Sequence, residues 1–164
     1  MRSVPALLLP AIAGVFLLAG CAGPPPVDEA ALHAWEKRQM ATDSDSDRDL
    51  GAMYAPESAG QSATGNDDEI DRGITITFAH PETVDHLEFS CFGDGHMSGS
   101  VMVVSGSTSR NHITESMPCG DGEQRIDLRR TWRADVDSIS FNGFDSDRDS
   151  AWNVRVIGAE PAED

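Results

Sequence analysis

The stretch Ile74-Thr75-Ile76-Thr77-Phe78 is the first in the chain where apolar and polar residues alternate strictly. Such a period of two is typical of a β-strand with one buried face. Short segments of this kind follow until residue 158, and turns containing Gly, Asp or Pro separate most of them. The segments span residues 74–78, 87–91, 97–105, 113–119, 124–130, 134–142 and 152–156. We therefore expect an all-β domain at 70–158, a seven-stranded antiparallel β-sandwich of immunoglobulin-like or jelly-roll type.

Two of these segments depart from simple alternation. Val101-Met102-Val103-Val104 is apolar on both faces, which favours a central strand. In the segment 134–142 the apolar spacing shifts between Val136 and Ile139, and a β-bulge would explain the shift. The pattern leaves the order of the strands open.

The N-terminal segment has a different character. A single charge at Arg2 precedes an apolar run from Val4, and the run ends in Leu18-Ala19-Gly20-Cys21. This pattern resembles the lipobox of bacterial lipoproteins. The resemblance implies that residues 1–20 are a signal peptide and that the thiol of Cys21 receives a diacylglycerol. It also implies an exported protein, anchored to the outer face of the cell membrane, because two acyl chains hold a protein stably.

Two other readings of this segment fit less well. A transmembrane helix needs about 20 apolar residues, whereas this run is shorter and contains Pro5 and Pro10. An ordinary signal peptide ends in an A-x-A-like cleavage site, which Ala19-Gly20-Cys21 matches poorly.

The remaining two cysteines, Cys91 and Cys119, form one possible pair. Disulfides form and persist in exported proteins, so we expect a bond between them that holds the strand lying between the two cysteines. The alternatives are two free thiols or a metal site. Two cysteines without a C-x-x-C spacing make a poor zinc site.

The chain is strongly acidic, with a formal net charge of −16. Such a surface repels phosphate groups, so we expect no nucleic acid among its partners. After removal of the signal peptide the chain is long enough for one domain and a tether.

Residues 21–69 are expected to form that tether. The triplet Pro24-Pro25-Pro26 favours an extended spacer, and good helix formers with Asp28 as N-cap predict a short helix near 28–40. The small, polar and acidic residues at 41–68 predict a disordered linker. Residues 159–164 are expected to be an acidic tail.

Alternating aspartates at Asp43, Asp45, Asp47 and Asp49 invite comparison with a calcium-binding loop. The EF-hand pattern requires Gly at its sixth position and Glu at its twelfth. Arg48 and Tyr54 hold those positions, so a solvated acidic linker is the favoured interpretation.

A second acidic run lies between two predicted strands and provides the best candidate ligand site: Asp145, Asp147, Asp149 and the nearby Trp152. Loop carboxylates, sometimes with calcium, and an exposed aromatic ring are common in glycan-binding sandwich modules. The competing interpretation is a plain acidic turn, with Trp152 buried in one row with Val154 and Val156.

Arg129, Arg130 and Arg133 form the only basic cluster, with Trp132 among them. Arginines in so acidic a protein are expected to pair with nearby aspartates across strands. The alternative is a patch that receives an anionic partner or wall polymer.

The sequence offers little for catalysis. It contains no G-x-S-x-G nucleophile motif, and its histidines lack short ligand spacing, so we expect solvated surface histidines rather than a metal site. We expect no enzyme and no cofactor, with calcium as the open alternative and a small hydrolase as the weaker one.

Cys-Phe-Gly-Asp-Gly at 91–95, Pro-Cys-Gly-Asp-Gly at 118–122 and Trp152-x-Val154-x-Val156 are loosely similar to small secreted lipoproteins of high-GC Gram-positive bacteria. Those proteins are mostly of unknown function, so the resemblance implies no catalytic residues. The expected function is non-catalytic binding of an envelope protein or a cell-wall glycan.

Overall fold

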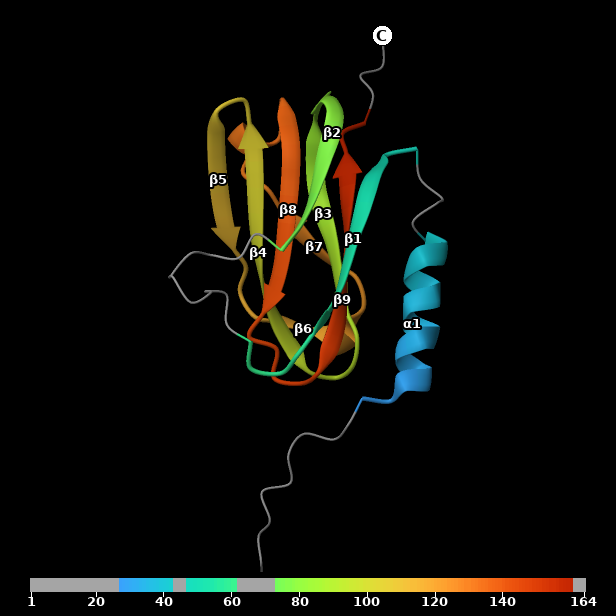
Figure 1. Cartoon of the computed structure of the whole chain (residues 1–164). Helices are drawn as coiled ribbons and strands as arrows, with labels where there is room; N and C mark the ends of the chain where they lie inside the picture. The colour runs from blue at the N-terminus through green and yellow to red at the C-terminus, as the bar shows by residue number, and fades with distance from the viewer. Residues whose placement is uncertain (1–26, 43–46, 62–72, 161–164) are drawn as a thin grey trace, which may run out of the picture.

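A computed structural model describes residues 27–42, 47–61 and 73–160. Two antiparallel β-sheets face each other, and one helix, α1 (Glu29–Thr42), stands outside them (Figure 1). None of the helices in the described part of the chain could span a membrane. The predicted signal peptide, Cys21, the linker residues 62–69 and the tail residues 161–164 lie outside the described residues.

The first sheet has four strands in the order β1-β9-β3-β7. Their bounds are Asp49–Glu57 for β1, Ser150–Gly158 for β9, Val84–Cys91 for β3 and Gln124–Asp127 for β7. The long central pair, β9 and β3, is buried on both faces along most of its length.

The second sheet follows the order β2-β8-β4-β5, and the short strand β6 also pairs with β4. Two 3₁₀ turns, η1 (Cys119–Asp121) and η2 (Arg130–Trp132), flank β7. The strands span Ile74–Glu82 for β2, Val136–Phe144 for β8, His96–Ser105 for β4, Thr108–Ile113 for β5 and Met117–Pro118 for β6.

The core lies between the sheets, where alternate residues of each strand point inward. Phe141 of β8 contacts Phe89 and Trp152 of the facing sheet, with ring centroids 5.6 and 5.0 Å apart. Two glycines make room for these rings. A Cβ on Gly99 would lie 2.5 Å from Phe141, and one on Gly143 would lie 2.5 Å from Trp152.

The all-β, antiparallel, two-sheet architecture is confirmed, but the sandwich has nine strands rather than seven. The largest error concerns β1, which occupies part of the segment predicted to be a disordered linker. Its inward residues Gly51, Met53 and Ala55 are mostly small, so they gave no apolar period. They are small because the facing sheet is close: a Cβ on Gly51 would lie 3.1 Å from Ile76.

The second error concerns residues 113–119, predicted as one strand. In the structure β5 ends at Ile113, and β6 begins only at Met117. The chain turns away at Thr114, whose backbone amide and side-chain oxygen both bond Gly99, each over 2.8 Å. Strand β5 itself, Thr-Ser-Arg-Asn-His-Ile, is an edge strand with polar residues on both faces, so it carried no periodic signal.

Two finer predictions are confirmed, and a third is not. Strand β4 is central, between β8 and β5. The pairing of β2 with β8 does shift register next to Val136, but the extra residues lie on β2, between Thr77 and Glu82, rather than in the segment 134–142 where a bulge was expected. Cys91 and Cys119 form a disulfide across a sequence separation of 28 residues. Because Cys91 ends β3 and Cys119 follows β6, the bond joins the two sheets at one end, and a loop of this length contributes about 3–4 kcal/mol.

The position of β1 makes the boundary of the sandwich testable. A chain that starts at residue 47 should unfold cooperatively, because it keeps β1 paired with β9. A chain that starts at residue 70 should lose at least about 2–5 kcal/mol, since removal of the buried Met53 alone has that effect. Urea denaturation of the two chains checks this. Equal stabilities would contradict the assignment of β1 to the fold.

Candidate functional site

Helix α1 lies against the outer face of the four-stranded sheet (Figure 1). It begins where predicted, because the Asp28 carboxylate accepts a hydrogen bond of 3.0 Å from the amide of Ala31. Beneath it, Tyr54, Asn153 and Ser90 lie side by side in one row across β1, β9 and β3. The helix therefore bridges three strands on the face opposite the core.

Trp35 is the one buried side chain among the described residues of α1. The Trp35 ring is 8% exposed and lies between Tyr54 and Phe92, with centroid distances of 6.4 and 6.1 Å. Two polar contacts accompany it. Tyr54 donates a hydrogen bond to Glu36, and the Ser90 hydroxyl donates one of 3.1 Å to the side-chain oxygen of Gln39.

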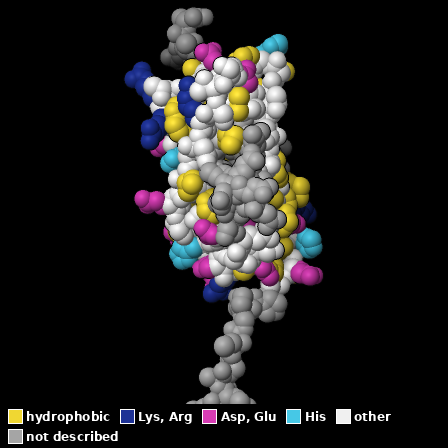
Figure 2. Space-filling view, turned by 60° about the vertical axis from the view of Figure 1, so that its left-hand side comes forward, with side chains coloured by type: hydrophobic (Ala, Val, Ile, Leu, Met, Phe, Trp, Pro, Cys, Tyr) yellow, Lys and Arg dark blue, Asp and Glu magenta, His cyan; other side chains and the backbone are white. Residues whose placement is uncertain are grey.

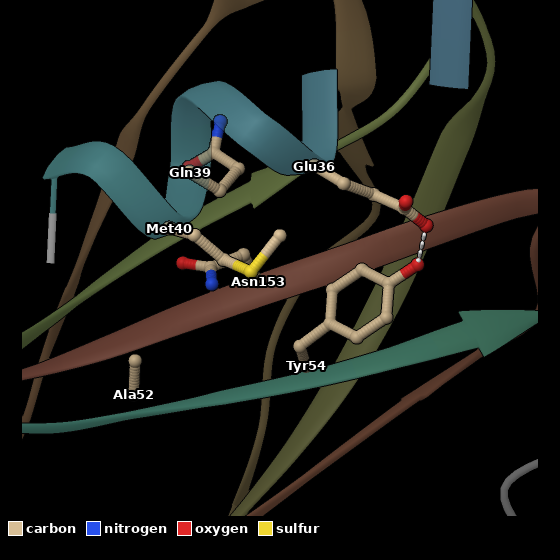
Figure 3. A pocket seen from close by; sticks show the side chains of 6 residues that line it. All are labelled: Glu36, Gln39, Met40, Ala52, Tyr54 and Asn153. Carbon is tan, nitrogen blue, oxygen red and sulfur yellow. Dashed lines mark hydrogen bonds between the residues drawn. The ribbon is translucent and has the colours of Figure 1, made fainter. Parts of the chain in front are cut away.

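A groove of about 240 Å³ lies between the helix and the sheet. It is lined by Glu36, Gln39 and Met40 of α1 and by Ala52, Tyr54 and Asn153 of the sheet. Figure 3 shows the Met40 side chain reaching over Asn153, and Tyr54 pointing back toward Glu36. Most of the lining surface is apolar, and the lining side chains include one aromatic ring, two amides and one carboxylate.

The Tyr54–Glu36 pair sets the electrostatics of this groove. Burial and the hydrogen bond to Glu36 raise the pKa of Tyr54 to about 12. The same bond, with a further one from His33, lowers the pKa of Glu36. Both shifts favour the neutral phenol of Tyr54 and the carboxylate of Glu36.

The groove residues were missed by sequence reasoning. Tyr54 and Ala52 lie in the segment predicted as linker, and Asn153 lies between two core residues of β9. The one available signal was the pair Met53-Tyr54, two large residues in a run of small ones, which is compatible with a strand that has one face inward and one outward.

The structure separates the residues of the predicted loop site. Trp152 is 1% exposed and belongs to the core, so the interpretation as an exposed binding aromatic is wrong for it. Asp147 accepts a hydrogen bond of 2.8 Å from the amide of His96, and Asp149 accepts one of 2.9 Å from the amide of Ala59. Asp145 adopts a left-handed conformation at the turn, with φ 50°.

These carboxylates thus hold three loops together at one end of the sandwich. The hydrogen bond from the His96 amide, helped by the His96 ring, keeps the pKa of Asp147 below its usual value. Within residues 27–42, 47–61 and 73–160, no three His, Cys, Asp or Glu side chains come together as a metal site.

The predicted basic cluster is also divided. Arg133 pairs with Asp85 at 2.9 Å and with Asp127 at 3.4 Å. Arg129 lies over the Trp132 ring, 5.3 Å from its centroid, and both Arg129 and Arg130 are exposed. Figure 2 shows Lys and Arg side chains gathered toward the upper left of the molecule, whereas several Asp and Glu side chains lie near the lower end.

Beside α1, the outer face of the same sheet carries an ionic network. Arg155 contacts Glu88 and lies 3.2 Å from Glu123 and 3.5 Å from Asp49. Burial alone would lower the pKa of Arg155, but these carboxylates outweigh it and raise that pKa.

A histidine belongs to this network too. His86 was expected to be a solvated histidine, yet it is buried, 2.9 Å from Asp85 and 3.3 Å from Glu88. Its hydrogen bond and the charge of Arg125 lower the pKa of Asp85.

We expect Tyr54 to titrate near pH 12, which ultraviolet absorbance can follow because it is the only tyrosine in the chain. In Glu36→Gln the titration should move toward about 10, the ordinary tyrosine pKa, without reaching it, because burial remains. A raised pKa stabilises the docked helix below about pH 10, and this contribution is lost as the pH rises toward 12. A titration near pH 10 in the unaltered chain would contradict this geometry.

Asp147→Asn should lower the free energy of unfolding by about 1 kcal/mol at pH 7, because a charge-assisted hydrogen bond to the His96 amide is weakened. The matched variant Asp145→Asn removes the same charge and should have little effect. Since the pKa of Asp147 is lowered on folding, the difference should fade as the pH falls below about 4. Thermal unfolding of both variants at pH 7 and pH 3 measures this difference in stability. Equal stability of the two variants at pH 7 would contradict the role of Asp147 in holding the loops together.

The chain matches no protein-family model, and no characterised protein is significantly similar to it.

Proposed function

We propose that the protein is exported, is anchored to the outer face of the cell membrane through Cys21, and binds a cell-wall glycan in the groove beside α1. The anchor rests on the lipobox-like Leu18-Ala19-Gly20-Cys21. The choice of a glycan as the ligand rests on the residues that line the groove, and this observation carries the proposal.

A sugar ring has apolar faces and an edge of hydroxyl groups, so it needs an apolar surface next to planar polar side chains. The exposed part of the Tyr54 ring and the methyl group of Ala52 provide the apolar surface. The amide of Gln39 and the carboxylate of Glu36 provide the polar side chains, and the amide of Asn153, 3% exposed, lies at the bottom of the groove. The volume of about 240 Å³ is below the ~300–1,000 Å³ of pockets for drug-sized ligands, which favours a single ring.

The same residues favour binding over catalysis. Glycoside hydrolysis usually needs two carboxyl groups on either side of the scissile bond. Among the residues that line the groove, Glu36 is the only carboxylate, and Tyr54 already donates to it.

The test is sedimentation of the lipid-free mature chain, residues 22–164, with purified cell-wall sacculi. We expect pelleting that Tyr54→Ala weakens by about tenfold, the effect of losing roughly 1.4 kcal/mol of aromatic contact. Ile113→Ala changes a side chain that is exposed on β5, away from the groove, and serves as the matched control.

Three other outcomes would overturn the assignment to the groove. Pelleting that requires calcium would indicate the Asp145–Asp149 loop. Pelleting abolished by salt and by Arg129→Ala with Arg130→Ala would indicate a charged wall polymer. A chain that never pellets would leave a protein partner as the ligand.

A further inference from the structure

Helix α1 contributes to two features of this protein. It forms one wall of the groove, and it is also the first described element after the lipidation cysteine. Resting on the function proposed above, we propose that α1 is a releasable strap: it leaves the sheet as a unit, and its release dismantles the groove while it lengthens the connection to the membrane.

Helix α1 packs thinly on the sheet. Of its described side chains only Trp35 is buried, while charged residues such as Glu29 and Lys37 are exposed around it. A helix without a wide apolar stripe has little to hold it on a sheet. A helix of 14 residues is also marginal in water by itself. Docking of α1 therefore depends on the Trp35 contact far more than on any broad interface.

The surface of the sheet under the helix is separate from the core. Met53, Phe89 and Val154 point to the opposite side, into the core, and are fully buried there. The residues that face α1 are polar or amphipathic: Tyr54, Ser90 and Asn153. Water can take over their hydrogen bonds when the helix leaves. Release of α1 thus uncovers a surface that tolerates water and leaves the core closed.

Release of α1 would also lengthen the connection between Cys21 and the sandwich. The helix begins at the end of the sandwich that carries the β8–β9 loop (Figure 1). With α1 docked, residues 22–28 can span at most about 25 Å from Cys21 to the helix. With α1 released, the helix adds about 21 Å and residues 43–48 add about 20 Å, for a reach of about 65 Å. Docking therefore holds the sandwich close to the membrane.

Ligand binding and docking of α1 are linked because one wall of the groove is the helix and the other is the sheet. A ring that touches Gln39 on the helix and Tyr54 on the sheet binds only while α1 is docked. By thermodynamic reciprocity, a ligand that needs docking must favour docking by the same factor. Glycan binding should therefore draw the sandwich toward the membrane, and release should free it.

The test begins without any ligand, on the lipid-free mature chain. Trp35→Ala should speed hydrogen exchange of the α1 amides by about tenfold or more and should return the Tyr54 titration to near 10. Amides of β3 and β9 should keep their protection. Lys37→Ala, an exposed change in the same helix, is the control and should alter neither measurement.

Two results of this step would overturn the strap. Unchanged α1 exchange and an unchanged Tyr54 titration in Trp35→Ala would mean that Trp35 does not hold the helix. Loss of protection in β3 and β9 would mean that α1 is an integral part of the fold.

The second step adds glycan solubilised from purified sacculi. It should slow exchange of the α1 amides in the unaltered chain, and Trp35→Ala should bind it at least about tenfold more weakly. Normal glycan binding by Trp35→Ala would overturn the coupling and leave the proposed function standing. If the unaltered chain binds no glycan, the proposed function and the coupling both fail, whereas release of α1 is still decided by the first step.

Discussion

The contact of Phe141 with both Phe89 and Trp152 governs the packing of the whole sandwich. It joins the two sheets at the centre of the core, and it requires glycine at positions 99 and 143 because a Cβ at either would overlap a ring. Close packing of this kind leaves no room for adjustment. It fixes the spacing of the sheets, and with it the outer surface on which α1 lies.

The outer face of the four-stranded sheet is divided between two kinds of chemistry. One part is the row of Tyr54, Asn153 and Ser90 under α1, and the next row carries Arg155 and Glu88. The ionic part explains how so acidic a chain keeps a folded surface: Arg155 lies among three carboxylates and Asp85 lies beside arginines. The division also limits the groove to the end of the sheet that the helix covers.

Because it contains helix α1, the segment that precedes the sandwich is more than a spacer. A spacer would only hold a domain away from its anchor, whereas this segment contributes Trp35 to a contact with the sheet and Glu36 to a pair with Tyr54. The groove therefore belongs neither to the sandwich nor to the helix alone. Its two walls meet at an interface in which Trp35 is the one buried side chain of the described part of α1.

Several features of this protein rest on local sequence pattern and could be predicted from it. Period-two runs predicted the strands around Ile76, Phe89 and Trp152, helix formers after Asp28 predicted α1, and two cysteines in a chain expected to be exported predicted their bond. The remaining features depend on contacts between distant parts of the chain. Strand β1 has too few large residues to show a period and is stabilised by pairing with β9. Asp147 and Asp149 accept hydrogen bonds from backbone amides about 50 and 90 residues away in the chain. No local pattern can reveal such partners. The groove, likewise, exists only because Tyr54 and Asn153 meet a helix across the sheet.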